Sequence, residues 1–188
     1  MREIEVKAHL HDHEAFLAAA AAEGIEFGPP IRQEDVTYLN GTPYGDPAWS
    51  IVRLRTQAGR SIMTMKFKAS DRARDNHELE TEVGKPDQAQ KMLERFGYKR
   101  HVRIAKTRRF AHFDGLELCY DEVDGVGWLA EVEKLTDESA DVDAIQAELW
   151  ALLKKLGVRD EDRELRGYDQ IIAQLQGVDK PEETNQAK

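Results

Sequence analysis

The sequence predicts an α+β fold in which an eight-stranded antiparallel β-barrel is flanked by helices. Eight stretches resemble strands, and most of them alternate apolar and charged residues with the period of two that is typical of β-strands. Short turns join several neighbouring stretches, and Asp114-Gly115 suits a type I′ hairpin turn, which indicates antiparallel pairing. Helical segments with cap residues interrupt this series.

The strands are expected wherever the alternation is maintained over several residues. In chain order they cover Arg2–Leu10, Gln33–Leu39, Ser50–Gln57, Ser61–Lys68, His77–Val83, Val102–Phe113, Leu116–Val123 and Trp128–Leu135.

Four helices are expected, and side chains that can cap a helix mark the start of three of them. Asp12 predicts the start of a helix over His13–Glu23, and Asp87 that of one over Gln88–Phe96. Asp141 or Asp143 begins a longer amphipathic helix that ends at Leu156. The last helix covers Tyr168–Leu175.

The chain reads as one domain followed by a tail. Its 188 residues are enough to bury a sizeable core, and no internal repeat or linker divides them. The domain is expected over residues 1–176. Residues 177–188 are polar without periodicity, which predicts a disordered C-terminal tail.

Composition narrows the choice of partners. The net charge of −9 argues against nucleic acid or an anionic membrane bound by bulk electrostatics. The longest apolar run, over residues 15–22, is too short to span a bilayer, and the start of the chain does not resemble a signal peptide. Cys119 is the single cysteine, which fits a reducing cytoplasm and is expected to be a buried, inert thiol.

The charged faces of the strands are sorted by sign. For any one strand, the favoured interpretation is that the charged face meets water. Like charges two residues apart gain nothing in water, however, so sorted sets favour a barrel with charged faces inward and helices over the apolar outside. The basic sets are Arg53 and Arg55, Lys66 and Lys68, Lys106 and Arg108; the acidic sets are Glu3 and Glu5 with Lys7, then Glu78, Glu80 and Glu82, Asp121, and Glu131 and Glu133.

These sets predict a ligand that carries its own charges. Arginine and lysine are the usual phosphate ligands. Carboxylates suit Mg²⁺ or Mn²⁺, and Mg²⁺ commonly bridges carboxylates to substrate phosphates. The residues alone therefore indicate a divalent metal with a polyphosphate.

An ordered set of motifs then points to a family. They are Glu3-Ile4-Glu5-Val6-Lys7, Gln33–Leu39, Leu54-Arg55, Met65-Lys66, Glu78–Glu82, Lys106-Thr107-Arg108, Leu118–Val123, Gly127–Glu133 and Tyr168–Ile172. The first resembles the ExExK signature of the CYTH family, also called triphosphate tunnel metalloenzymes, and the rest resemble that family in order. The resemblance reaches Leu175 and implies an eight-stranded tunnel that binds a triphosphate and a divalent metal.

The resemblance also implies roles for single residues. The implied metal ligands are Glu3, Glu5, Glu131 and Glu133, helped by Asp121 and Glu80. The implied triphosphate ligands are Lys7, Arg53, Arg55, Lys66, Lys106 and Arg108. Lys7, Arg55, Lys106 and Asp121 are the catalytic candidates. Lys68, Glu78 and Glu82 share the same strand faces and rank lower.

The family resemblance leaves more than one activity open. The leading prediction is a class IV adenylate cyclase, which converts ATP to cyclic AMP and pyrophosphate with Mg²⁺ or Mn²⁺. The alternatives are a triphosphatase acting on thiamine triphosphate, tripolyphosphate or a nucleotide, and a non-catalytic nucleotide- or polyphosphate-binding module. The cyclase group also implies a homodimer.

Three features fit the tunnel less directly. Val102 and Ile104 share a face with Lys106, so their strand is expected to bulge or to leave the tunnel. A metal site at His9 and His11 is a weaker hypothesis, since zinc sites use three or four convergent ligands. Trp49 and Trp128 could stack on a base, although packing is favoured.

Overall fold

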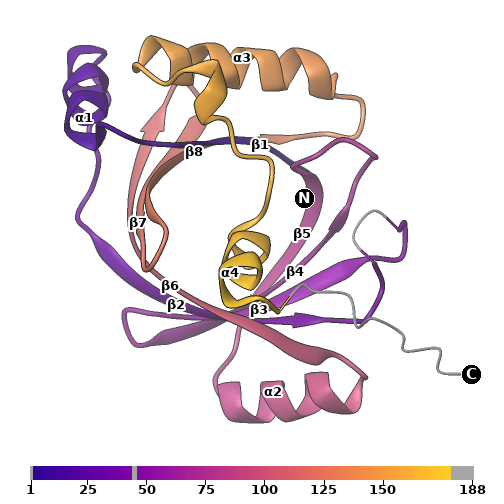
Figure 1. The fold of residues 1–188 in the computed structure, drawn as a ribbon. Coiled ribbons are helices and arrows are strands. Elements are labelled where there is room, and N and C mark those ends of the chain that lie inside the picture. The colour runs from indigo at the N-terminus through magenta and orange to yellow at the C-terminus, as the bar shows by residue number, and fades with distance from the viewer. Residues whose placement is uncertain (1, 44–45, 179–188) are drawn as a thin grey trace, which may run out of the picture.

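The eight strands close on one another as an antiparallel barrel in the computed structural model, which describes residues 2–43 and 46–178 (Figure 1). The strand order around the barrel is β1-β5-β4-β3-β2-β6-β7-β8. The predicted fold class is therefore confirmed. The strands are β1 (Arg2–His9), β2 (Ile31–Leu39), β3 (Ser50–Gln57), β4 (Arg60–Lys68), β5 (Asp75–Glu82), β6 (Lys99–Phe113), β7 (Leu116–Val123) and β8 (Gly127–Thr136).

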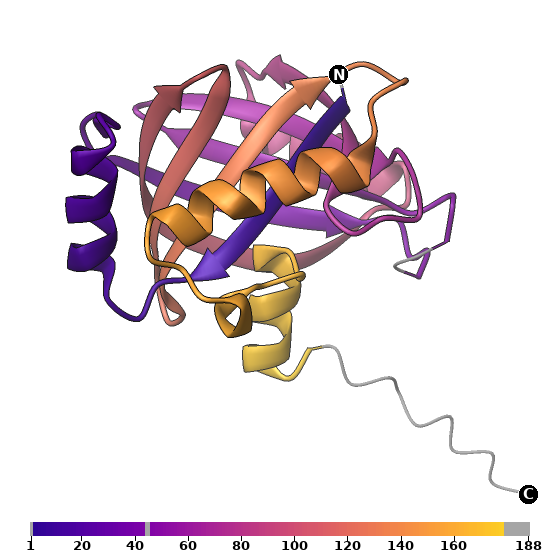
Figure 2. The same cartoon turned by 90° about the horizontal axis from the view of Figure 1, so that it is seen from above.

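Two helices cover the outer face of the wall that β1, β7 and β8 form. These are α1 (His13–Ala22) and α3 (Val142–Lys155), and α3 lies across β1 and β8 (Figures 1 and 2). Ile4 and Val6 point outward from β1 and are buried with Leu149 of α3 in the largest core cluster. The apolar faces of these strands therefore lie outside the barrel, because a side-chain period of two sends their charged neighbours inward.

A third helix, α2 (Pro86–Arg95), covers β2 and β3 through Leu93, which packs with Tyr38 and Val52. The prediction that Asp87 caps this helix is wrong. Lys85 is the N-cap residue and makes no side-chain cap hydrogen bond. Pro86 takes the first helical position, where its fixed φ and missing N–H cost nothing, so Asp87 falls in the first turn. Asp12 and Asp141 do cap their helices, accepting from Ala15 N at 2.9 Å and Ala144 N at 3.1 Å.

The last helix, α4 (Tyr168–Gln176), lies across one end of the barrel, after the short helix η1 (Asp160–Asp162) (Figures 1 and 2). Its residues Ile171 and Ile172 pack on Val102 and Ile104 of β6. The bulge expected in that strand is present. Between Val36 and Tyr38 the register shifts, so that three steps along β6 match two along β2.

Val102 and Ile104 nonetheless remain with the inner wall, because α4 gives them an apolar partner there. One end of the barrel interior is thus an apolar seat for a helix, while the rest is lined by charged groups. Gly177 ends α4 in the left-handed conformation, at φ 66°. The predicted tail lies outside the described residues from position 179 onward. No helix in the described part of the chain is long and apolar enough to cross a membrane.

Candidate active site inside the barrel

A cavity of about 340 Å³ occupies the barrel interior, and its lining is mainly charged. Eleven of the twelve residues predicted for the site line it: Glu3, Glu5, Lys7, Arg53, Arg55, Lys66, Glu80, Lys106, Arg108, Glu131 and Glu133. Asp121 does not. Of the three lower-ranked residues, Glu78 lines the cavity, whereas Lys68 and Glu82 are absent from its lining. Strand parity therefore brings together residues that are far apart in the sequence.

Carboxylates gather on one side of the cavity, where β1, β7 and β8 run side by side. Glu133 lies directly opposite Glu5 on β1 and directly opposite Glu117 on β7. Oxygens of Glu3, Glu5 and Glu133 all lie within 4.8 Å of one another. Like charges directly opposite each other destabilise an antiparallel sheet, so this arrangement calls for a cation.

Glu133 carries the clearest sign of missing positive charge. Within the described part of the chain it has neither a hydrogen bond nor an ion pair. Burial, and then the carboxylates of Glu3 and Glu5, raises the pKa of Glu133 to about 9. A divalent cation would supply the missing charge, and carboxylate oxygens are the ligands that Mg²⁺ and Mn²⁺ prefer. Glu3, Glu5 and Glu133 fit such an ion.

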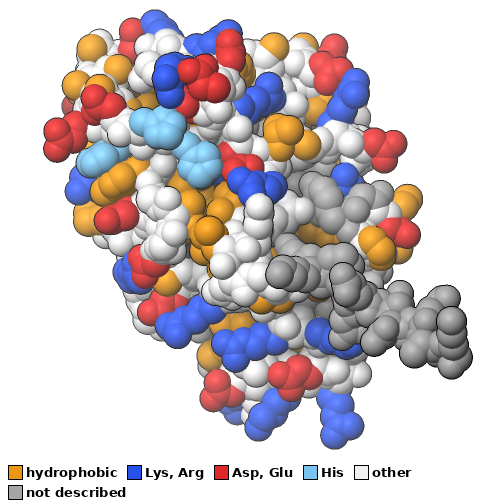
Figure 3. All heavy atoms as spheres, in the orientation of Figure 1, with side chains coloured by type: hydrophobic (Ala, Val, Ile, Leu, Met, Phe, Trp, Pro, Cys, Tyr) orange, Lys and Arg blue, Asp and Glu red, His pale blue; other side chains and the backbone are white. Residues whose placement is uncertain are grey.

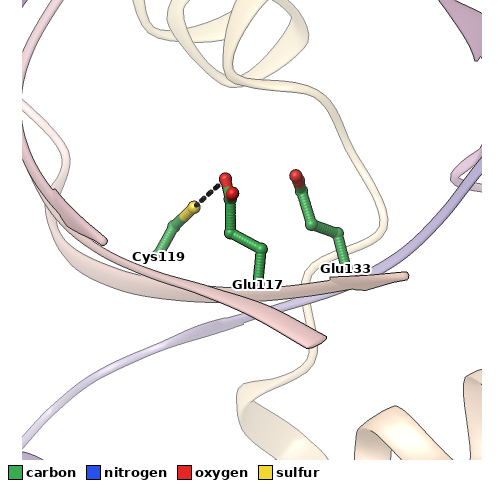
Figure 4. A group of neighbouring side chains, drawn as sticks. All are labelled: Glu117, Cys119 and Glu133. Carbon is green, nitrogen blue, oxygen red and sulfur yellow. Dashed lines mark hydrogen bonds between the residues drawn. The ribbon is translucent and has the colours of Figure 1, made fainter. Parts of the chain in front are cut away.

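Cys119 lies beside this group, on the inner face of β7 (Figure 4). Its Sγ is 3.9 Å from Glu117 Oε1, and Glu117, Cys119 and Glu133 form a second group of possible ligands that shares Glu133. The prediction of a buried thiol is confirmed. Burial raises the pKa of Cys119 well above its usual value, which fits an unreactive thiol.

Arginines of β3 line the cavity opposite the carboxylates. Arg55 donates two hydrogen bonds of 2.8 Å to Asp35, so its guanidinium is held by a buried partner. Arg53 is engaged less fully: it donates to Thr64 Oγ1 at 3.0 Å and lies 4.0 Å from Glu80, with 20% of its side chain exposed. Arg53 is therefore more available to an incoming anion than Arg55.

Asp121 lies on the same face of β7 as Glu117 and Cys119, covered by the side chains of three donors that share it as acceptor. Arg108 reaches it at 2.7 and 2.5 Å, Lys106 at 3.1 Å and the Tyr168 hydroxyl at 2.7 Å. Burial works to raise the pKa of Asp121, but Arg108 and Lys106 hold it below its usual value. Burial and then Arg108 lower the pKa of Lys106 to about 8. The structure thus places Asp121 among cations and away from the Glu3–Glu5–Glu133 group.

Glu131 is similarly committed to protein cations. It pairs with Lys7 at 3.0 Å and with Arg108. Burial opposes its ionisation, yet Lys7 and Arg108 hold the pKa of Glu131 well below its usual value. Glu131 therefore neutralises cations that border the Glu3–Glu5–Glu133 group.

Tyr168 connects α4 to these cations. Lys7 Nζ and Lys106 Nζ lie 3.9 and 4.5 Å from the centre of its ring, and its hydroxyl donates to Asp121. Such contacts hold the start of α4 over the end of the cavity, since a buried cation near a ring face is attracted to it.

Replacing Tyr168 with Phe is expected to lower the free energy of unfolding by about 1.5–3 kcal/mol, since a hydrogen bond to a charged acceptor is lost. The ring and its lysine contacts remain. Urea denaturation of Y168F against wild type measures the change, with Y98F as a control, because the Tyr98 hydroxyl hydrogen-bonds to the neutral Ser50 hydroxyl. A loss in Y168F no greater than in Y98F would contradict the assigned role of the hydroxyl.

Some cavity residues were not predicted. Gln33, Asp35 and Thr37 alternate along β2, so the parity that identified the other strands could have found them. Arg74 could not be found that way, because it lies in the loop between β4 and β5, where no strand period applies.

The tryptophans and histidines considered as base or metal ligands are absent from the cavity lining. Trp128 stacks on His13 at 4.2 Å and on Tyr120 at 4.8 Å beside the outer core, so the packing interpretation is confirmed. Trp49 is buried. His9 pairs with Glu164, and no group of possible metal ligands among the described residues contains a histidine. The pale-blue histidines in Figure 3 lie on the molecular surface.

The sequence itself decides the family. The CYTH domain matches residues 1–168. This chain belongs to the CYTH family. Adenylate cyclase CyaB of Aeromonas hydrophila is 26% identical over 175 residues, which cover 92% of this chain and 89% of that protein.

Solved structures share the CYTH fold. A conserved protein of Pyrococcus furiosus superposes with a TM-score of 0.76 at 26% identity, covering 89% of this chain and 98% of that one. HpAC1 from Hippeastrum, for which a dominant triphosphatase activity is described, has a TM-score of 0.59 at 19% identity and covers 94% of this chain and 95% of that one. The second likeness concerns the fold alone.

Proposed function

We propose that this CYTH protein is a divalent-metal-dependent enzyme that acts on a triphosphate inside the barrel, as a class IV adenylate cyclase. The observation that carries the proposal is the separation of charge across one cavity. Three carboxylates gather on one side, and Glu133 among them has no ion pair within the described residues, while arginines of β3 line the opposite side. A metal–triphosphate complex carries both signs of charge and would complement both sides.

Glu3, Glu5 and Glu133 are the proposed metal ligands, with Glu80 near the arginine wall as a further candidate. When bound, Mg²⁺ or Mn²⁺ would neutralise phosphate oxygens and so favour attack at phosphorus. Glu131 and Asp121 take a different part in the proposal. Their contacts with Lys7, Arg108 and Lys106 orient these cations toward the substrate.

The cations are proposed to bind the phosphates and to stabilise charge that develops on them. Arginines and lysines that are held in place stabilise developing negative charge most strongly in a buried site, where water does not screen them. The proposed triphosphate ligands are Lys7, Arg53, Arg55, Lys66, Lys106 and Arg108. Lys106 is of special interest because its lowered pKa, about 8, would let it exchange a proton near neutral pH.

Two observations bear on the choice of reaction. The 26% identity to CyaB, which extends over 92% of this chain, supports the cyclase. Phe110 and Ile62 give the cavity apolar surface that a base could contact. A triphosphatase needs no such surface, and the predominance of charged side chains in the lining supports it as the second candidate. In the cyclase the ribose 3′-hydroxyl attacks the α-phosphorus and pyrophosphate leaves, whereas in a triphosphatase water attacks the terminal phosphorus.

A product assay tests the proposal. Purified protein is incubated with ATP, thiamine triphosphate or tripolyphosphate, each with Mg²⁺ and with Mn²⁺. Cyclic AMP with pyrophosphate is the expected result. Orthophosphate without cyclic AMP would replace the cyclase with the triphosphatase, and no product from any substrate would leave a binding module. Size-exclusion chromatography with light scattering checks the predicted homodimer.

Arg53→Gln is expected to weaken tripolyphosphate binding by roughly 10- to 100-fold, because hydrogen bonds to charged groups are worth about 1.5–3 kcal/mol. Arg53 suits this test better than Arg55, whose removal would leave Asp35 buried without its partner. Calorimetric titration measures the affinity. Arg103→Gln is the control, since Arg103 is exposed and pairs with Glu34. Equal affinities of R53Q and R103Q would remove Arg53 from the phosphate ligands.

A further inference from the structure

Arg74 is a cavity residue to which neither the family resemblance nor the strand pattern gives a role. It lies in the loop between β4 and β5, and its backbone has a φ of 62°. That is the left-handed region, which residues other than glycine seldom occupy. The side chain enters the cavity and is only 14% exposed. A strained backbone that delivers a buried guanidinium to a candidate site suggests a functional constraint.

The guanidinium of Arg74 binds the carboxylate side of the cavity. It pairs with Glu5 and lies 3.7 Å from Glu131. These two carboxylates raise the pKa of Arg74 although burial works to lower it, so the group is always charged. Its Nε is buried and has no hydrogen-bond partner among the described residues. The guanidinium therefore neutralises Glu5 while one of its own donors stays unused.

The backbone around Arg74 is held independently of this side chain. The amide of Glu5 donates to Arg74 O at 3.1 Å, and Gln146 of α3 donates to Ala73 O at 2.8 Å. Arg72 pairs with Asp143 at 2.6 Å on the surface. Because these contacts fix the loop to β1 and α3, the Arg74 side chain can change partners without any movement of the loop.

Two cations therefore compete for the Glu5 carboxylate. It belongs to the group of three carboxylates that fits a divalent cation, and the Arg74 guanidinium already occupies it. One carboxylate in a crowded acidic group cannot serve a guanidinium and a metal ion equally well. A metal that binds Glu5 must repel Arg74 or displace it.

We propose that Arg74 is a placeholder cation that exchanges between metal site and substrate. Without metal, it neutralises Glu5 and Glu131. When a divalent ion takes Glu5, the guanidinium leaves that carboxylate and its free donors bind oxygens of the triphosphate. Metal and triphosphate binding are thereby coupled through one side chain. The inference rests on the proposed function for the identity of the two ligands, but not on turnover.

The test measures binding of Mn²⁺ and of tripolyphosphate to the full chain by titration calorimetry, with R74Q compared with wild type. R74Q is expected to bind Mn²⁺ alone at least about fivefold more tightly, since no guanidinium has to be displaced. It is expected to bind tripolyphosphate in saturating Mn²⁺ at least about tenfold more weakly. R74K keeps the positive charge and is expected to recover most of the tripolyphosphate affinity.

Arg72→Gln is the matched control, because Arg72 lies in the same loop but on the surface. Unchanged or weaker Mn²⁺ binding in R74Q would overturn the placeholder role, even if tripolyphosphate affinity fell. If R74Q does not fold without metal, refolding in Mn²⁺ decides: recovery of the native circular dichroism spectrum supports the proposal, and no recovery overturns it. Both affinities can be measured on a protein without cyclase or triphosphatase activity. The product assay alone therefore tests the proposed function, and the titrations test the role of Arg74.

Discussion

Asp121→Asn is expected to lower the free energy of unfolding by about 3–5 kcal/mol, the usual cost of breaking a buried ion pair by removing one partner. Asp121 has no exposed surface and accepts from Arg108, Lys106 and Tyr168. The amide keeps the shape of the carboxylate but not its charge, and its NH₂ group cannot accept the bonds that a carboxylate oxygen accepts. Arg108 then keeps its ion pair with Glu131, whereas Lys106 loses the carboxylate with which it pairs.

Urea denaturation of D121N at neutral pH measures this loss. Asp124→Asn is the control, because Asp124 is three residues away on the surface and makes a similar two-bond contact with Arg32. Exposed pairs are worth about 0–1 kcal/mol, so D124N is expected to remain close to wild type. Equal losses in the two variants would mean that Asp121 does not organise the buried cations.

Glu133→Gln is expected to abolish metal-dependent turnover and to weaken Mn²⁺ binding by at least about tenfold. Even the loss of an outer-shell partner typically costs a metal site roughly 10- to 100-fold, and Glu133 is proposed as a direct ligand. The readouts are Mn²⁺ titration followed by electron paramagnetic resonance and the product assay. Glu122→Gln is the control, since Glu122 is exposed on the same hairpin. Wild-type Mn²⁺ affinity in E133Q would rule out Glu133 as a ligand.

The raised pKa of Glu133 also determines how the stability of the metal-free protein is expected to depend on pH. The pKa of Glu133 is about 9 in the fold against an ordinary value of 4.5, so between these values the folded state holds more protons than the unfolded state. Stability then falls as the pH rises. Lys106, whose pKa is lowered to about 8, adds the opposite slope only above that pH.

The difference between wild type and E133Q, unfolded in a chelator between pH 5 and 8, therefore reports the contribution of Glu133. Wild type is expected to lose stability steadily across this range, and E133Q to lose less. Mn²⁺ is expected to reduce the slope in wild type by replacing the proton. A wild-type slope identical to that of E133Q would show that Glu133 titrates normally.

The fold could be predicted because alternation carries a simple physical meaning. On β1, Ile4 and Val6 must face one way and Glu3 and Glu5 the other. The outward apolar faces of such strands then have to be covered by helices, and α1 and α3 cover them. The same parity brought eleven predicted residues to one cavity. It could not set the register between strands, which places Glu5 opposite Glu133.

The sequence could not reveal features that depend on contacts between strands, or residues in loops, where side chains follow no regular alternation. Asp121 shares strand parity with the metal candidates, yet its neighbours on β6 are cations, so its carboxylate is committed to them. Arg74 lies in a loop, where alternation says nothing of direction. Val102 and Ile104 looked out of place in a polar interior until α4 supplied their partner.

The closure of the barrel has a consequence for how the chain folds. The neighbours of β1 are β5 and β8, so β1, the first of the eight strands in chain order, waits for the last before its pairing is complete. Such non-local pairing costs loop-closure entropy before it is repaid and is typical of slow folders, on the order of milliseconds to seconds. Until β8 arrives, Glu3 and Glu5 sit on an open edge without the carboxylate that completes their group. The proposed metal site is thus completed in one late step, and a chain that lacks β8 lacks one of its three carboxylates.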